Sequence, residues 1–217
     1  MKLHTVVGSP NCRRVEAVIN HLGIAVDKQY HDFFAGDLRL PGYVSLNPNS
    51  MVPALEDGAF VLWESNAITQ YLADKAGADA LFPRDPQKRA DVVRWQCWEL
   101  AHFNKAFGAI AWETIAKPPL NLGAANEALV EASLKDLSRF AALLDRHMAG
   151  RRYLVGDDIT IADYSMITLE KFERATPFDW APHPNVGAYF ERMRKVDHWA
   201  RTAPAQPSDV GRKPRAA

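Results

Sequence analysis

The sequence of 217 residues contains only two cysteines, Cys12 and Cys97. Two thiols do not make the disulfide framework that stabilises small exported domains, so the cysteine content gives no indication of export. The apolar part of residues 1–8 is also too short for the hydrophobic region of a signal peptide. We therefore expect a cytoplasmic, reducing environment for this protein.

Long hydrophobic runs and a charge excess are absent as well. No apolar run approaches the roughly 20 residues that a membrane-spanning helix requires. Lys plus Arg and Asp plus Glu both number 26, so the formal net charge is zero. Domains that hold nucleic acid usually carry a basic excess. We therefore expect neither a membrane nor a nucleic acid among the partners of this protein.

What is present is the composition of a soluble globular protein, with 47% apolar and 24% charged residues, and a length that suits two domains. Over the first third of the chain, apolar periodicity predicts strands at 3–7, 26–34, 52–55 and 60–63 and helices at 12–22 and 64–75. The helix between the first two strands makes them parallel, whereas the turn Asp57-Gly58 makes the last two antiparallel. The first domain is therefore predicted to be a βαβ-ββα unit.

No segment beyond the Gly- and Pro-containing residues 77–86 predicts a strand. Helices are predicted at 87–117, 124–149 and 185–196, and a further helix follows Thr160, where Thr-x-x-Asp resembles a capping box. We therefore expect an α/β domain at 1–77, a linker at 78–86, an all-α domain at 87–202 and a tail at 203–217. The tail is rich in Pro, Arg and Lys, and we expect it to be solvated and partly disordered.

Two polar segments stand between a predicted strand and a predicted helix. Ser9-Pro10-Asn11-Cys12 comes before the first helix, where backbone N–H groups and partial positive charge stabilise an anion or a thiolate. Glu64-Ser65 begins the helix of 64–75, and together these side chains can hold an ammonium group and a carboxylate. Each segment taken alone is also consistent with an ordinary helix N-cap.

Four motifs in this order and spacing give the sequence a family resemblance. They are Ser9-x-x-Cys12-Arg13-Arg14-Val15, Asn47-Pro48-Asn49-Ser50-Met51-Val52-Pro53-Ala54-Leu55, Trp63-Glu64-Ser65-Asn66-Ala67-Ile68-x-x-Tyr71-Leu72 and Asp157-Asp158-Ile159-Thr160-Ile161-Ala162-Asp163. With them, the chain resembles the cytosolic glutathione transferases over essentially its full length. The serine-type branches, which include theta-, phi- and zeta-like bacterial members, fit better than the tyrosine-type ones, because residues 3–7 contain no tyrosine.

The resemblance implies a thioredoxin-like domain that binds glutathione, followed by an all-helical domain that completes a second pocket. The implied activity is conjugation of the glutathione thiolate to small hydrophobic electrophiles. Glutathione would be a co-substrate, with no cofactor and no metal. The resemblance also implies a cytoplasmic homodimer that serves detoxification.

The motifs carry the family's site residues onto this sequence. Ser9 takes the position of the catalytic serine. Val52 takes the position that pairs through its main chain with the cysteinyl part of glutathione, before a proline whose peptide bond we expect to be cis. The expected glutathione-binding residues are Ser9, Asn11, Met51, Val52, Pro53, Glu64 and Ser65, of which the last pair would hold the γ-glutamyl end.

Met51 departs from the family pattern, in which Lys, Arg or Gln commonly comes before Val-Pro and faces the glycyl carboxylate of glutathione. Ser50 stands where Gly is common, and Leu38 stands near a position that is polar in theta-like members. The candidates for the missing interaction are Arg39, Asn49 and Arg13.

The long helix predicted at 87–117 supplies the candidates for the electrophile pocket. Trp95, Trp98 and His102 are spaced to share one face of it. Core packing explains the two tryptophans at least as well, and a histidine on such a face is more often a hydrogen-bonded core residue. Alignment with the family adds two positions, so that the expected substrate-pocket residues are His102, Asn104 and Phe107.

Two other functions stay open. A thiolate of Cys12 at the helix start would be activated, which would give Cys-dependent thiol-disulfide chemistry on glutathione, or dehalogenation. The sequence lacks a Cys-x-x-Cys pair, which argues against thioredoxin-type cycling. Met51 leaves open a non-catalytic, transferase-like interaction module, as in some translation and stress factors.

Overall fold

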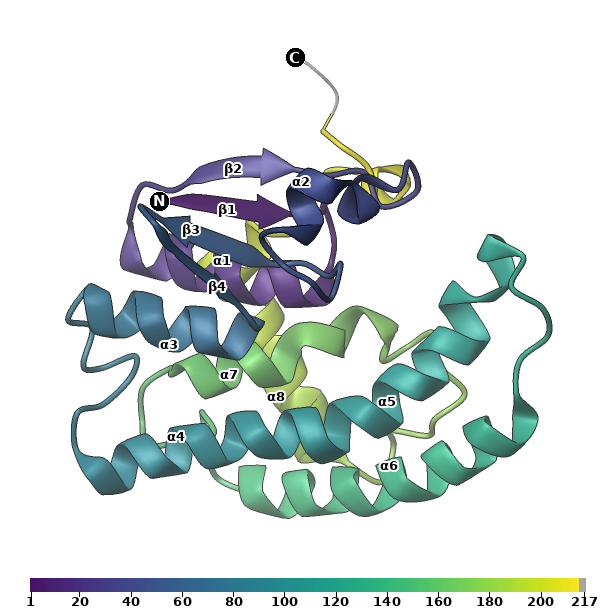
Figure 1. The fold of residues 1–217 in the computed structure, drawn as a ribbon. Helices are drawn as coiled ribbons and strands as arrows, with labels where there is room; N and C mark the ends of the chain where they lie inside the picture. Colours follow the sequence, from purple (N-terminus) through teal and green to yellow (C-terminus); the bar gives the residue numbers. More distant parts are fainter. Residues whose placement is uncertain (215–217) are drawn as a thin grey trace. The chain divides into compact units, whose positions relative to one another are not determined.

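The computed structural model describes residues 1–214, and Figure 1 shows their fold. The chain forms two compact units. The first comprises residues 1–82 together with the segment from Val196 on, and the second comprises Pro83–Lys195.

The first unit is built on a four-stranded sheet with the order β2-β1-β3-β4. Its elements are β1 (Lys2–Thr5), α1 (Pro10–Leu22), β2 (Asp27–Tyr30), α2 (Pro41–Val44), β3 (Ala54–Asp57), β4 (Phe60–Trp63) and α3 (Ser65–Lys75). Strand β1 runs parallel to β2 and antiparallel to β3, and β3 is antiparallel to β4. This topology confirms the predicted βαβ-ββα fold.

One face of the sheet carries the core of this unit. Leu3 of β1 and Leu55 of β3 lie opposite each other in the ladder, and both are fully buried. Helices α1 and α3 pack together and contribute Val15, Val18, Ile68 and Leu72, all of them buried. Burial of one side chain of this kind contributes about 1.5–3 kcal/mol to stability, so the sheet is a firm support for the loops at its ends.

The second strand is shorter than the predicted 26–34, because side chains turn the chain after Tyr30. The Asp32 amide donates to the Asp37 carboxylate at 2.9 Å, and the Ala35 amide donates to the Asp32 carboxylate at 2.8 Å. These bonds replace strand pairing with a loop that ends in the short helix η1 (Asp37–Arg39).

The second unit, Pro83–Lys195, contains helices joined by loops and no strand. Its helices are α4 (Pro86–Trp98), α5 (Asn104–Ala111), α6 (Glu127–Met148), α7 (Ile161–Met166) and α8 (Pro184–Arg194), with 3-10 turns at Pro118–Leu120 (η4) and Ile167–Phe172 (η5). The helix predicted at 87–117 is α4 and α5 joined by the π-helical segment Glu99–Phe103 (η2), followed by a second such segment, Trp112–Ala116 (η3). Between residues 1 and 214, no helix is both long and apolar enough to cross a membrane.

Side-chain caps mark where the helices of this unit begin. The Asp85 carboxylate accepts from the Lys88 amide at 2.9 Å at the start of α4, and Asn126 caps α6 in the same way. The predicted capping box of Thr160 and Asp163 is present at the start of α7. These caps satisfy N–H groups that a helix otherwise leaves without partners.

The helical unit ends at Lys195, whereas we expected the all-α domain to extend to residue 202. The short helix α9 (Asp197–Ala200) joins the first unit, because the buried Arg13 side chain lies over the Trp199 ring at 4.1 Å and donates to the Thr202 hydroxyl at 3.0 Å. The described part of the expected solvated tail, 203–214, also lies on the first unit and includes the turn η6 (Pro207–Asp209). Residues 215–217 lie outside the described part of the chain.

Candidate functional site

Ser9 occupies the N-cap position of α1 without using its side chain as a cap. The residue is half-buried and extended, and its hydroxyl makes no cap hydrogen bond. Its main chain is fixed, because the Ser9 amide donates to the Val6 carbonyl at 3.2 Å and the Arg13 amide donates to the Ser9 carbonyl at 2.9 Å. The hydroxyl therefore stands at the positive end of a helix dipole on a well-held backbone.

Cys12, one turn into the same helix, is fully buried. Burial raises the pKa of its thiol to about 11, although hydrogen bonding between the thiol and the Thr5 and Ser9 side chains lowers it. At neutral pH this group is therefore a thiol, and it packs as a small apolar side chain. The geometry does not supply the exposed, electropositive surroundings that a reactive cysteine needs.

The start of α3 brings Glu64 and Ser65 together at the end of β4. Glu64 has a φ of 73° and a ψ of 110°, a conformation that is rare for a residue with a side chain. Such strain costs about 1–3 kcal/mol and occurs preferentially at ligand-binding sites. The Glu64 side chain is exposed, whereas Ser65 is buried as the first residue of the helix.

Arg14 of α1 lies beneath this helix start. Its side chain is fully buried, and its guanidinium donates to the Ser65 hydroxyl at 3.2 Å and to the side-chain oxygen of Asn66. The sequence motif included Arg14, but sequence reasoning gave it no role. The available signal was its position: a charged residue on the apolar face of a helix needs a buried polar partner.

The segment Met51-Val52-Pro53 leads into β3, and its Val52–Pro53 bond is cis, as predicted. The Met51 carbonyl accepts from the Tyr43 hydroxyl and, at 2.8 Å, from the side-chain amide of Asn47. Val52 packs against a buried cluster of Val6, Leu38 and Tyr43. Sequence reasoning missed the roles of Tyr43 and Asn47, which hold the main chain next to Val52.

The candidates to replace a cation at Met51 differ in their surroundings. Met51 is 67% exposed and offers no charge. Arg13 is engaged with Trp199 and Thr202, and the Asn49 side chain donates to the Asn47 side-chain oxygen at 3.2 Å. Arg39 is exposed at the end of η1. Asn11, in the first turn of α1, is exposed as well.

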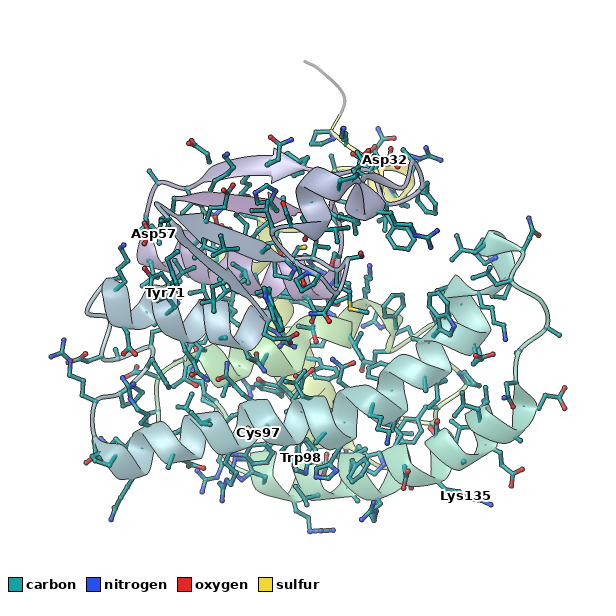
Figure 2. All side chains as sticks on the ribbon, in the orientation of Figure 1. Asp32, Asp57, Tyr71, Cys97, Trp98 and Lys135 are labelled. Atoms are coloured by element: carbon teal, nitrogen blue, oxygen red, sulfur yellow. The ribbon has the colours of Figure 1, made fainter. Side chains whose placement is uncertain are left out.

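The hairpin and the helix that follow Pro53 are tied together at their far ends. The Tyr71 hydroxyl of α3 donates to the Asp57 carboxylate at 2.6 Å, and Figure 2 labels both residues. Lys75 forms an ion pair with the same carboxylate. These bonds fix the position of α3 on the β3–β4 hairpin and thereby the position of Ser65.

In the helical unit, Trp95, Trp98 and His102 gather as their spacing predicted. The Trp95 and Trp98 ring centroids are 5.2 Å apart, and those of Trp98 and His102 are 6.4 Å apart. Figure 2 labels Trp98 on α4, and its ring meets Phe140 of α6 at 5.9 Å. Trp95 is buried, and with Trp98 it lines a hollow of about 380 Å³ between α4 and α6.

The three expected substrate-pocket residues lie in different surroundings within this unit. His102 is exposed and stands beside Phe140, with ring centroids 5.3 Å apart. Asn104 donates to the Glu99 carboxylate at 2.7 Å. Phe107 is fully buried against Phe103 and Trp180. The structure therefore groups His102 with the aromatic cluster of α4 and α6 and puts Phe107 in the core.

Within residues 1–214, no group of three or more His, Cys, Asp or Glu side chains is suited to hold a metal. The site of the first unit consists instead of a hydroxyl at a helix start, the strained Glu64 with the Ser65 hydroxyl at a second helix start, and the half-buried Val52 before a cis proline. These groups suit hydrogen bonding to a peptide-like ligand that carries its own charges.

Comparison with known proteins agrees with this arrangement. The glutathione S-transferase N-terminal domain family matches residues 8–75, and the C-terminal domain family matches residues 103–197. A theta-class glutathione S-transferase from Xanthomonas axonopodis pv. citri, solved with glutathione bound, is 29% identical with a TM-score of 0.84 over 94% of this chain and 97% of the other.

Two further solved structures extend the comparison. A delta-class glutathione transferase from Nilaparvata lugens is 27% identical, with a TM-score of 0.80 over 93% of this chain and 92% of the other. Glutathione transferase F7 from Populus trichocarpa shares the fold, with a TM-score of 0.84 at 23% identity over 93% of this chain and 96% of the other. The family matches cover both units of the fold, and the chain therefore belongs to the glutathione S-transferase family.

Proposed function

We propose that this protein conjugates the thiolate of glutathione to small hydrophobic electrophiles, with Ser9 donating the hydrogen bond that stabilises the thiolate. The observation that carries this proposal is the Ser9 hydroxyl, which stands at the N-terminus of α1 and does not cap the helix. Family membership and a theta-class relative with glutathione bound support it.

The energies involved are sufficient for this role. A free thiol has a pKa of about 8.5, and lowering it by two units needs about 2.7 kcal/mol of preferential thiolate stabilisation. A hydrogen bond to a charged group contributes about 1.5–3 kcal/mol. A helix N-terminus adds about 0.3–1 kcal/mol. Ser9 and the start of α1 together reach the required range.

The remaining groups of the first unit suit the other parts of glutathione. The Glu64 carboxylate suits the γ-glutamyl ammonium, and the Ser65 hydroxyl with the N-terminal end of α3 suits the γ-glutamyl carboxylate. The Val52 main chain would pair with the cysteinyl residue. Arg39 is the exposed cation that we propose for the glycyl carboxylate.

The two alternative functions are less well supported. Cys-dependent chemistry requires a thiolate, but Cys12 is fully buried and its pKa is raised. A non-catalytic interaction module would explain Met51, but it gives no reason for the strained backbone of Glu64.

We also propose a cytoplasmic homodimer that acts in detoxification, with His102, Asn104 and Phe107 contributed by the helical unit to the electrophile pocket. Light scattering that gave a monomer mass at micromolar concentration would contradict the dimer.

The decisive experiment compares Ser9→Ala with Cys12→Ala. Thiolate absorbance of the glutathione complex and the pH dependence of conjugation are measured for both variants. Ser9→Ala should raise the thiol pKa by about one unit or more, with turnover at a pH well below the thiol pKa of the unmodified complex falling at least about tenfold. Glutathione affinity should change little, since Glu64, Ser65 and Val52 still hold the peptide.

Two controls sharpen this comparison. Ser9→Thr keeps a hydroxyl and should retain part of the lowered thiol pKa. Cys12→Ala should keep both the pKa and the turnover. If Ser9→Ala keeps its rate and Cys12→Ala loses it, the cysteine chemistry becomes the leading interpretation. If the unmodified chain is not retained on immobilised glutathione, the non-catalytic interaction module becomes the leading interpretation.

A further inference from the structure

The C-terminal segment 206–213, called here the C-terminal brace, joins two loops of the first unit through a single residue. Gly211 donates its amide N–H to the Val7 carbonyl at 2.9 Å and accepts from the Phe33 amide at 2.7 Å through its own carbonyl. Figure 1 shows this yellow segment beside the chain that leads into α2. Val7 lies in the loop between β1 and α1, and Phe33 lies in the loop between β2 and η1.

The brace approaches both loops too closely for an ordinary side chain at the contact points. Gly8 has a φ of 74°, and a Cβ there would lie 2.9 Å from a methyl group of Val210. Gly211 has a φ of 81°, and a Cβ there would lie 2.6 Å from the Phe34 ring. Glycine on each side of the contact is therefore what allows the segment to lie on the loops.

Charged side chains hold the end of the brace against the second loop. Lys213 forms an ion pair with Asp37 at 2.8 Å, and the Arg212 guanidinium lies over the Phe34 ring at 5.2 Å. The beginning of the brace is folded on itself: the Gln206 amide donates to the Asp209 carboxylate, and the Asp209 amide donates to the Gln206 carbonyl, both at 3.0 Å. This turn brings Val210 and Gly211 to the loops in a defined conformation.

The brace adds little to the hydrophobic core. Within 206–213 only Gly211 is buried; Asp209 and Val210 are half-buried and the other five residues are exposed. Core burial is therefore not what explains its contacts with the two loops. Those loops carry Ser9, two residues after Val7, and Arg39, two residues after Asp37.

We propose that the C-terminal brace is a positioning element of the glutathione site, which holds the Val7–Gly8 turn and with it the Ser9 hydroxyl in the geometry that stabilises the thiolate. The inference rests on the proposed function of Ser9. No residue of the brace is assigned contact with glutathione. It acts through the backbone on which Ser9 stands, and through the loop that carries Arg39.

The test compares matched pairs of variants of the full protein. A chain ending at Gln206 lacks the contacts of Val210, Gly211 and Lys213, whereas a chain ending at Pro214 keeps all of them. Gly211→Ala puts a methyl group against Phe34. Its control is Gly150→Ala, where φ is 71° and a Cβ would meet nothing within 4 Å, so the backbone strain is matched without the contact.

Three quantities are measured: hydrogen exchange in segments 6–12 and 33–39, the thiol pKa of bound glutathione, and kcat separately from KM for the electrophile. Loss of the brace should speed exchange in both segments and raise the thiol pKa by about half a unit, which is about threefold less thiolate at a pH well below that pKa, where kcat is compared. The fall in kcat should match the loss of thiolate, and KM for the electrophile should stay unchanged. The Pro214 chain and Gly150→Ala should behave like the unmodified protein.

The outcomes separate this inference from the proposed function. If exchange speeds up in the shortened chain while its thiol pKa and kcat stay unchanged, the positioning role is overturned and the function of Ser9 stands. If exchange does not change, the brace does not hold the loops, and the inference is overturned as well. If the unmodified protein does not lower the thiol pKa of glutathione, the proposed function fails and the inference falls with it.

Discussion

The guanidinium of Arg14 lies 3.2 Å from the hydroxyl of Ser65 and bonds the side chain of Asn66 as well. A fully buried cation on α1 thus reaches the first two residues of α3, which follows β4 in the chain. Ser65 belongs to the proposed site for the γ-glutamyl end of glutathione, and Ser9 at the start of α1 is proposed to bind its thiol. The Arg14 contact therefore connects the elements that carry these two parts of the site.

We predict that Arg14→Met weakens glutathione binding more than it slows turnover. Without the guanidinium, the Ser65 hydroxyl and the start of α3 lose a partner, and a hydrogen bond to a charged group is worth about 1.5–3 kcal/mol. KM for glutathione should rise about tenfold or more at that cost, with kcat at saturation changed less. Steady-state kinetics with glutathione as the varied substrate measure both.

The control for this prediction is Arg152→Met, since Arg152 is exposed in the helical unit. It should leave KM unchanged. Arg14→Lys keeps a charge but not the forked geometry of the guanidinium. Its KM for glutathione should therefore lie between those of Arg14→Met and Arg152→Met. A fall in kcat with an unchanged KM would show that Arg14 acts on Ser9 and not on Ser65.

Met51→Lys should tighten glutathione binding, because it introduces a cation where the family commonly has a polar or charged residue facing the glycyl carboxylate. An exposed ion pair is worth about 0.2–1 kcal/mol, so the gain should be a few-fold at most. Calorimetry with glutathione measures it, and Met51→Leu controls for the change of side-chain shape. The gain should vanish with γ-glutamylcysteine, which lacks the glycyl group. Unchanged binding of glutathione would mean that another residue, with Arg39 the first candidate, already fills this role.

The parts of the fold that sequence reasoning predicted are those set by local patterns. The apolar strand segments, the Asp57-Gly58 turn and the Thr160–Asp163 capping box each act over a few residues. The turn and the capping box appear where they were expected, and four strands form, although the second is shorter than predicted. The π-helical segments were not predictable in this way. Their apolar spacing fits a continuous helix and does not distinguish an α-helical turn from the wider π-helical one.

The contacts that sequence reasoning missed join residues far apart in the chain. Gly211 bonds Val7 across more than 200 residues, and Arg13 bonds Thr202 across 189. A tail rich in Pro, Arg and Lys has the composition of a solvated segment, and composition does not reveal that two glycines, Gly8 and Gly211, allow it to lie on the loops. Buried Arg14 and Tyr43 were likewise within or near recognised motifs, but their partners are defined only by the fold.

A pH dependence of stability follows from His31. Burial, and then the neighbouring His4, lower the pKa of His31, and the side chains of Asp37 and Lys213 face it as well. The two imidazoles are in contact at 2.9 Å, and His4 also bonds Glu56 at 2.7 Å. Because the unfolded chain binds the His31 proton more tightly, the free energy of unfolding contributed by this group is present above pH 6.5 and is lost as the pH falls below it.

We therefore predict that acidification from pH 7.5 to 5.5 lowers the free energy of unfolding of the unmodified protein more than that of His31→Gln. Urea unfolding at several pH values measures the difference in slope. Gln29→Ala, an exposed change on β2 two residues before His31, should leave the slope unchanged. Equal slopes for the unmodified protein and His31→Gln would contradict the assignment.

The last prediction concerns Asp163, whose buried carboxylate accepts four hydrogen bonds at the start of α7. One oxygen accepts from the Leu154 amide at 2.9 Å and from the Tyr189 hydroxyl at 3.0 Å; the other accepts from the Thr160 amide and hydroxyl at 2.9 and 3.2 Å. Burial raises the pKa of this carboxyl to about 6, while the hydrogen bonds from Thr160, Leu154 and Tyr189 oppose the rise.

Asp163→Asn replaces one acceptor oxygen by an NH₂ group, so that donors face donors in a site without solvent. Each buried donor left without a partner costs about 1–3 kcal/mol, and the free energy of unfolding should fall by about 2–4 kcal/mol. Asp158→Asn is the matched control, because Asp158 is exposed in the same segment and should change stability by less than about 0.5 kcal/mol. Urea unfolding at pH 7.5 compares the two variants. If Asp163→Asn unfolds at the same urea concentration as Asp158→Asn, the hydrogen bonds at this helix start do not stabilise the second unit.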